Sequence, residues 1–319
     1  MTNSEVFLQQ MIIGLSNGMI IALIALGYTM VYGIVELINF AHGDLFMLGA
    51  FLALTLLAML GIDQLGSIAT LSWLVLPLFV CVPLFCGVVN WLVDRLAYRP
   101  LRDAPRLAPL VSAIGVSFIF VNIGLFWGGL PMEVFSHGIA AAAPKDFPAL
   151  VSTDNLLEGG NITLTLNEVL VFAITLPMMA GLSLFVKFTR LGKAMRAVAQ
   201  NPTAAKLMGI DVDRVIGATF FIGGALAGVA SVVYASYNQT IYFQMGFRVG
   251  IDAFTAAVLG GIGSMPGAML GGLVIGVVRA MSDQYIATQW TNVVVFTILV
   301  FVLIFRPSGI LGRAVREKV

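Results

Sequence analysis

The feature that most constrains this chain is a set of eight stretches that contain no Asp, Glu, Lys or Arg. They cover residues 6–35, 45–62, 65–93, 107–132, 169–186, 215–247, 253–278 and 284–305. A helix needs about 20 apolar residues to cross the ~30 Å hydrocarbon layer of a bilayer, and each stretch approaches or exceeds that length. With 59% hydrophobic and 10% charged residues, the chain also holds more apolar surface than a water-soluble core of its size encloses. The sequence therefore predicts an all-α polytopic membrane protein with one transmembrane domain over residues 1–319.

Positive charges gather in three short segments. Fourteen of the 17 Lys and Arg residues lie there, namely Arg95, Arg99, Arg102 and Arg106; Lys187, Arg190, Lys193, Arg196, Lys206 and Arg214; and Arg306, Arg313, Arg316 and Lys318. Because cytoplasmic loops carry the excess of Lys and Arg, we expect these segments to face the cytoplasm. Residues 133–168 hold one lysine against five acidic residues and are predicted to form an external loop. Counting crossings from these anchors puts the N-terminus outside and the C-terminus in the cytoplasm.

One apolar stretch does not fit this count. The chain exits outward near residue 238 and must end inward at Arg306, so the segment 253–283 has to begin and end on the external side. One straight helix cannot do that, but glycines and a proline interrupt the stretch at residues 260–267. The sequence predicts two short helices, 252 to about 259 and 268 to about 283, as a hairpin or half-spanning pair. The expected total is 8–9 transmembrane helical segments.

A dense polar cluster follows the first apolar stretch and consists of Glu36, Asn39, His42 and Asp44. Polar groups this close to hydrocarbon are costly unless they are buried in protein or face a wet cavity. Tyr28 and Tyr32 lie one helical turn apart just before the cluster. We interpret these residues together as part of the lining of a translocation path. The alternative is an ordinary interfacial turn in which His42 and Asp44 cap the next helix.

The glycine-rich break is a second candidate for the path or its gate. The residues concerned are Gly260, Gly261, Gly263, Ser264 and Pro266. Ser264 is a candidate N-cap, and a helix that begins there directs unpaired N–H groups and the positive end of its dipole into the membrane, which suits a carboxylate. The alternative role is packing, because the glycines at 267, 271, 272 and 276 follow the small-xxx-small spacing of close helix contacts.

The basic stretch 189–214 has the pattern of two short amphipathic helices. Apolar positions recur at helical spacing on both sides of Asn201-Pro202, and proline can begin the second helix. A rigid helix pair at the membrane surface has the shape needed to dock into the groove of a soluble partner, whereas the plain alternative is a solvated connection. The residues expected to form this cytoplasmic coupling loop are Arg196, Asn201, Pro202, Ala205, Leu207, Gly209 and Ile210.

The chain lacks the motifs of an enzyme. It holds no phosphate-binding GxxxxGK[ST] loop, no HExxH motif and no GxSxG motif. Cys81 and Cys86 lie inside one apolar stretch and are expected to be plain small side chains rather than a disulfide or metal pair. We therefore expect no catalysis, cofactor or metal, and the net charge of +1 gives no indication of nucleic acid. Uphill transport would need energy from another chain.

Three segments together resemble one known family. Residues 22–44 read ALIALGYTMVYGIVELINFAHGD, residues 196–216 read RAVAQNPTAAKLMGIDVDRVI, and residues 254–272 read FTAAVLGGIGSMPGAMLGG. They resemble the LivH-like permeases of the high-affinity branched-chain amino acid ABC transporters, and the likeness continues through RPSGILGR at residues 306–313. In that family the stretch 196–214 is similar to the coupling loop that enters a groove of the ATPase.

The resemblance implies an importer of leucine, isoleucine and valine in a bacterial inner membrane. Its parts would be this subunit, a homologous second permease, two cytoplasmic ATPases and a periplasmic binding protein. Two alternatives stay open. A urea or short-chain amide ABC permease would share much of the same frame, and an ion-coupled secondary amino acid carrier would also use broken helices. The shortage of buried ionisable groups counts against the second.

Overall fold

The computed structural model describes residues 2–35, 39–60, 68–102, 104–105, 107–151, 154–157 and 161–312, with only the backbone considered for residues 68–75. Its long helices are α1 (Asn3–Val35), α2 (Ala41–Met59), α3 (Ile68–Val93), α4 (Leu107–Gly128), α5 (Leu166–Phe188), α8 (Val212–Asn238), α9 (Met245–Gly260), α10 (Met265–Ser282) and α11 (Thr291–Phe305). Two short helices, α6 (Arg190–Gln200) and α7 (Pro202–Leu207), lie between α5 and α8. The predicted all-α polytopic fold is confirmed.

Helical turns and a minimal sheet complete the described chain. A π-turn (Asp94–Tyr98) and a 3-10 turn (Arg99–Leu101) follow α3, and a 3-10 turn (Glu133–Gly138) follows α4. A second π-turn (Asp283–Ala287) and a 3-10 turn (Thr288–Trp290) join α10 to α11. The strands β1 (Lys145–Asp146) and β2 (Thr240–Ile241) pair antiparallel, with Lys145 opposite Ile241.

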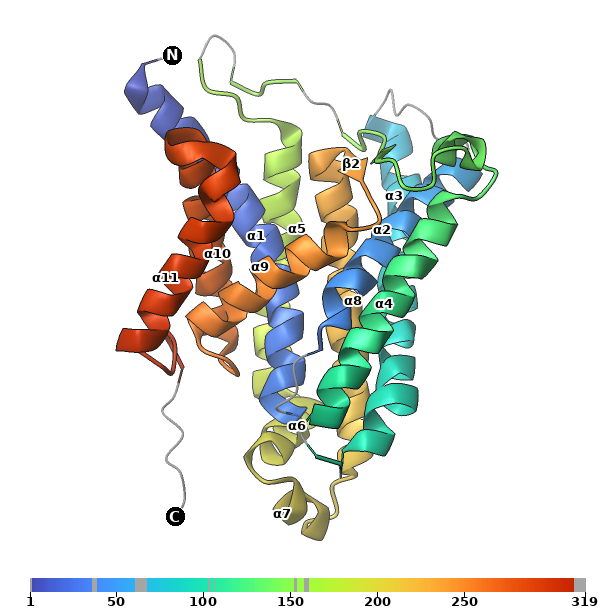
Figure 1. Cartoon of the computed structure of the whole chain (residues 1–319), viewed down its shortest axis with the longest axis vertical. Coiled ribbons are helices and arrows are strands. Elements are labelled where there is room, and N and C mark those ends of the chain that lie inside the picture. The colour runs from blue at the N-terminus through green and yellow to red at the C-terminus, as the bar shows by residue number, and fades with distance from the viewer. Residues whose placement is uncertain are drawn as a thin grey trace.

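Seven described stretches are long and apolar enough to cross a membrane. The last of them, Met265–Phe305, doubles back between α10 and α11, as Figure 1 shows. The helices run roughly along one axis, and α6 and α7 lie at the end of the bundle opposite the start of α1 (Figure 1). We call these the α6–α7 end and the N-terminal end. The turn between α9 and α10 points toward the α6–α7 end.

The core of the bundle is built around α1 and α8, whose apolar windows are mostly buried, whereas α4 and α5 present apolar side chains outward. On α4, Phe118 and Phe126 are exposed, as expected for a helix that faces lipid. The most extensive contact between described helices joins α1 to α10. A Cβ atom on Gly276 would lie 2.3 Å from the Cα of Gly18, so the backbones meet only because both residues lack side chains. The packing role proposed for the later glycines of α10 is therefore confirmed.

The predicted helix pair near residues 252–283 exists, but its first boundary was wrong. The first helix begins at Met245 rather than near residue 252, and the second begins at Met265 rather than near 268. The charge of Asp252 marked the expected boundary, yet this side chain is buried inside α9 and accepts a 2.5 Å ion-pair contact from Arg279 of α10. A charge ends an apolar stretch in the sequence, but it does not end a helix when a neighbouring helix supplies its partner.

The described part of the segment 133–168 (residues 133–151, 154–157 and 161–168), which was predicted to be an external loop, lies at the N-terminal end (Figure 1) and is anchored there. Lys145 is 3% exposed, and its ammonium donates to the carbonyls of Phe135 and Ala140 at 3.3 and 2.6 Å. Burial lowers the pKa of the Lys145 ammonium below its ordinary value. The β1–β2 pair fixes the same segment to the link between α8 and α9.

Candidate transport site

The break between α9 and α10 is a tight turn held by the end of the described chain. Gly261 has a φ of +105°, and a Cβ there would lie 2.3 Å from the backbone nitrogen of Gly312, so both its conformation and its surroundings require glycine. The backbone N–H groups of Ile310 and Leu311 donate to the carbonyls of Leu259 and Gly260, each at 2.9 Å. These bonds satisfy carbonyls that the end of α9 leaves free.

α10 begins as its sequence predicts. The Oγ atom of Ser264 accepts a hydrogen bond from the N–H of Gly267 at 3.2 Å, and Pro266 occupies the first turn, where its missing N–H costs nothing. Ser264 as N-cap is therefore confirmed. With Gly263 and Pro266 it lines a cavity of about 820 Å³ whose other walls include Lys187 and Arg196. The break and the basic stretch, far apart in sequence, thus share one cavity.

The polar cluster 39–44 is buried rather than interfacial. α2 begins at Ala41, so His42 and Asp44 lie in its first turn, and each is 1% exposed. No side chain caps α2, so the interpretation of His42 and Asp44 as caps is not supported. The ring of Tyr28 contacts the edge of His42 with centroids 4.7 Å apart. Glu36 lies outside the described residues.

Asp44 links α2 to α4 next to a second cavity. One carboxylate oxygen accepts a short hydrogen bond from the hydroxyl of Ser117, and the other has no hydrogen-bond partner among the described residues. Ser117 and Tyr28 both line a cavity of about 860 Å³ between α1, α4 and α9. The cavity walls are mainly apolar, and Arg248 is the one charged residue among them. Tyr32 is partly buried and does not line this cavity.

Asn39 belongs to a different set of contacts from His42 and Asp44. Its side-chain oxygen accepts a 2.7 Å hydrogen bond from the hydroxyl of Tyr98, and its amide nitrogen donates to the side-chain oxygen of Asn90 at 3.2 Å. Asn90 in turn donates to the carbonyl of Phe220 on α8 at 2.6 Å. Sequence reasoning missed Asn90 and Tyr98. The one sequence signal for Asn90 was its amide side chain near the end of the apolar stretch 65–93, where a polar group needs a partner.

The two predicted short helices of the basic stretch are present as α6 and α7. Asn201 caps α7 by accepting a 3.0 Å hydrogen bond from the N–H of Ala204, and Pro202 is the first helical residue. Ala205 is buried against the bundle and its carbonyl accepts from the N–H of Ile210, which closes the helix. Gly209 has a φ of +81° and follows the helix end.

The tip of the α6–α7 pair exposes two large apolar side chains. Leu207 is 85% exposed and Met208, which sequence reasoning did not single out, is 82% exposed. Arg196 is oriented differently from the other predicted coupling residues. Its guanidinium donates to the carbonyls of Val186 and Lys187 at 2.7 and 3.2 Å, so it ties α6 to the end of α5.

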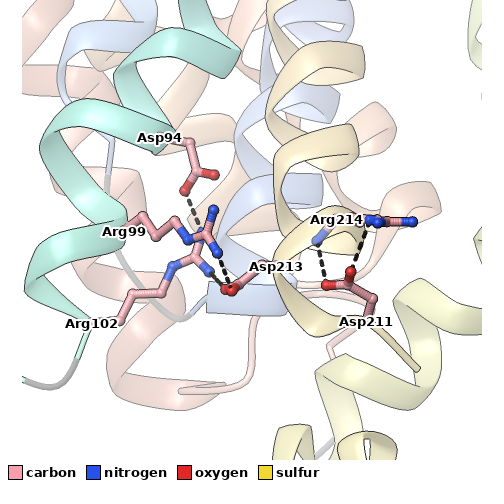
Figure 2. Close-up of polar contacts among 6 residues, drawn as sticks. All are labelled: Asp94, Arg99, Arg102, Asp211, Asp213 and Arg214. Atoms are coloured by element: carbon pink, nitrogen blue, oxygen red, sulfur yellow. Dashed lines mark hydrogen bonds and ion pairs between the residues drawn. The ribbon is translucent and has the colours of Figure 1, made fainter. Parts of the chain in front are cut away.

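A network of charged residues joins the start of α8, which follows the α6–α7 pair in the chain, to the segment after α3, as Figure 2 shows. Asp213, in the first turn of α8, accepts contacts from Arg99 at 2.5 Å and from Arg102 at 2.6 Å. Arg102 also binds Asp94 at 2.6 Å through its other terminal nitrogen. In the sequence, these arginines indicated only which segments face the cytoplasm, and no pattern identified their partners.

Comparison with known proteins gives the family. A model of the permease component of branched-chain amino acid transport systems matches residues 10–303. The high-affinity branched-chain amino acid transport system permease protein BraD of Pseudomonas aeruginosa is 43% identical, over 98% of both chains. The corresponding LivH proteins of Salmonella typhimurium and Escherichia coli K12 are 41% and 40% identical, also over 98% of both chains. No solved structure matches.

The apolar helices, the buried polar groups within them and the cavities that they enclose are those of a multi-pass membrane transport subunit. The chain belongs to the family of branched-chain amino acid transport system permease components.

Proposed function

We propose that this chain is a permease subunit of an ATP-driven importer of leucine, isoleucine and valine in a bacterial inner membrane. It works with a homologous second permease, two cytoplasmic ATPases and a periplasmic binding protein. Membership of the family and identity of 40–43% to BraD and two LivH proteins over almost the whole chain support the solute class. In this assignment the α6–α7 end faces the cytoplasm, and the N-terminus and residues 133–168 face the periplasm.

The observation that carries the assignment of an ATPase partner is the exposed tip of the α6–α7 pair. Leu207 and Met208 extend from a short capped helix that is anchored at Ala205, and neither is covered by the described chain. Apolar side chains presented by a rigid helix at a membrane surface suit a groove in a soluble protein. We assign this tip to the ATPase, and Arg196 to holding α6 in place through its bonds to the end of α5.

Two regions are candidates for the solute path. The cavity of about 860 Å³ is large enough for one amino acid. Its apolar walls suit an aliphatic side chain, and the guanidinium of Arg248 on its wall suits the carboxylate. Tyr28 lies on its wall and Asp44 just behind Ser117. The turn at Gly263 and Ser264 closes the α6–α7 end, where we place the gate.

The test uses the importer assembled in proteoliposomes with its ATPases, second permease and binding protein. Met208→Asp should abolish binding of the ATPases and ATP-dependent uptake of radiolabelled leucine, because a carboxylate cannot enter an apolar groove without a large desolvation cost. Met59→Asp is the matched control, because Met59 is also a highly exposed methionine (75%) but is the last residue of α2, outside the α6–α7 pair. It should retain ATPase binding. Full ATPase binding and uptake in Met208→Asp would refute the assignment.

A further inference from the structure

We propose that two sets of polar contacts, Asp213–Arg102–Asp94 and Tyr98–Asn39, which the π-turn Asp94–Tyr98 joins into one network, transmit movement of the α6–α7 pair to the start of α2. Arg102 and Tyr98 are then positioning residues that couple ATP hydrolysis to the solute path. The inference rests on the proposed function, because it takes the α6–α7 pair as the part that the ATPase moves.

The network begins where the α6–α7 pair joins the bundle. Asp211 caps α8 by accepting from the N–H of Arg214 at 3.1 Å, and Asp213 follows in the same first turn. Only four residues, 208–211, separate α7 from α8. A displacement of α7 therefore acts directly on the turn that carries Asp213, which Arg99 and Arg102 hold to the end of α3.

Arg102 is the centre of the network because it binds two carboxylates with two different nitrogens. Nη1 contacts Asp213 and Nη2 contacts Asp94, each at 2.6 Å. The Arg102 side chain is 17% exposed and that of Asp94 is 4% exposed, so the second contact is largely shielded from water and salt. Figure 2 shows the guanidinium between the two carboxylates. A lysine has one charged nitrogen and could not reproduce this fork.

The π-turn Asp94–Tyr98 carries the network away from the ion pairs. Its first residue binds Arg102 and its last is Tyr98, which is 3% exposed. Single π-helical turns of this kind are rare and are frequent at functional sites. Here the turn joins an ion pair at the α6–α7 end to a buried hydroxyl.

The network ends at the segment that precedes α2. Tyr98 donates to Asn39, which lies two residues before α2 begins and next to the buried His42. Asn39 also binds Asn90, and Asn90 binds the carbonyl of Phe220 on α8. The start of α2 is thus tied both to the π-turn and to α8. Asn39 acts as a connecting group in this arrangement rather than as a contact of the solute.

The experiment measures leucine uptake per ATP hydrolysed in the assembled importer. In Arg102→Gln we expect ATPase binding and hydrolysis to persist while uptake per ATP falls by roughly 5- to 150-fold, the usual range for loss of coupling between two sites. Arg102→Lys should fail to restore the ratio, whereas a role in net charge alone predicts full rescue. Arg95→Gln is the matched control. Arg95 lies in the same π-turn as Asp94, is exposed, and places its guanidinium over the ring of Trp91, 5.3 Å from the ring centroid, rather than on a carboxylate of the network.

Tyr98→Phe tests the buried half of the network without disturbing the ion pairs. It removes one hydroxyl and keeps the ring against Phe220, whose centroid lies 5.6 Å away. We expect uptake per ATP to fall several-fold, by about 5-fold at the low end of typical coupling, with thermal stability close to that of the wild type. Unchanged uptake per ATP in both Arg102→Gln and Tyr98→Phe would overturn the inference. That outcome would leave the proposed function intact, because Met208→Asp tests ATPase docking independently.

Discussion

Two tight helix pairs of this bundle are held together in different ways. α1 and α10 meet through glycines, and a Cβ on Gly272 would lie 2.5 Å from the Cα of Ala22. α3 and α8 also pack closely, but at the α6–α7 end their contact is made by Asp94, Arg102 and Asp213. The α1–α10 contact depends on volume, and so does the middle of the α3–α8 contact, where a Cβ on Gly224 would lie 2.4 Å from the carbonyl oxygen of Cys86. The end of the α3–α8 contact differs because it depends on charge and hydrogen bonds.

The difference separates what fixes the fold from what can transmit a movement. Backbone contacts between glycines have one favourable distance, and any added atom separates the helices. The outer ion pair of the network, Arg99–Asp213, has side chains 48% and 39% exposed, so it can be exchanged for water at modest cost. We therefore expect changes in the α1–α10 contact to act on folding, and changes in the α3–α8 network to act on coupling.

The largest effect is expected at the glycine contact. In Gly276→Val the new Cβ would lie 2.3 Å from the backbone of Gly18, so α1 and α10 must separate. Because overpacking of well-packed cores costs about 1–3 kcal/mol even where side chains can adjust, and here only backbone is present, we expect the destabilisation to exceed about 3 kcal/mol. The measurement is the yield of monodisperse protein in detergent and its thermal transition.

The matched control is Gly181→Val on α5, where a Cβ meets no atom within 4 Å. It should behave like the wild type. A Gly276→Val protein that is as stable as Gly181→Val would mean that α10 does not pack on α1 in this way.

A smaller effect is expected where α10 meets α9 through a charged pair. Arg279→Met leaves Asp252 buried without its partner. Removal of one member of a buried pair costs about 3–5 kcal/mol, and because these side chains keep 12% and 8% exposure we expect a value near the lower bound. The double variant Asp252→Leu with Arg279→Met should recover most of this loss, since an apolar pair needs no desolvation.

Thermal unfolding of the two variants in detergent provides the measurement. If the double variant is as unstable as the single one, the pair holds α9 in place through geometry that apolar side chains cannot replace. The contrast with the glycine contact would then be smaller than we infer.

What could be predicted from the sequence was local. The start of α7 at Pro202, the cap at Ser264 and the helix break within residues 260–267 depend on residues within a few positions of one another, and all three are confirmed. The predicted start of α9 was wrong because Asp252 has its partner 27 residues away on another helix, which the local sequence does not indicate. The Tyr98 bond to Asn39 and the Arg102 bond to Asp213 span 59 and 111 residues. Such pairs exist only once the helices are packed, and no spacing rule reveals them.

The smallest effect is expected at the caps of α7 and α10. These caps compare a short helix held mainly by local hydrogen bonds with a long helix held by packing against α1. Asn201→Ala removes the side chain that caps α7, a six-residue helix with one buried residue, so the usual cost of about 1 kcal/mol should appear as local opening. Ser264→Ala removes the equivalent bond from α10, which the α1 contact holds along its length. Hydrogen exchange should therefore accelerate at the amides of α7 in the first variant, by about fivefold for 1 kcal/mol, and change little along α10 in the second. Equal acceleration in the two helices would show that packing does not protect α10, contrary to the role assigned to its glycines.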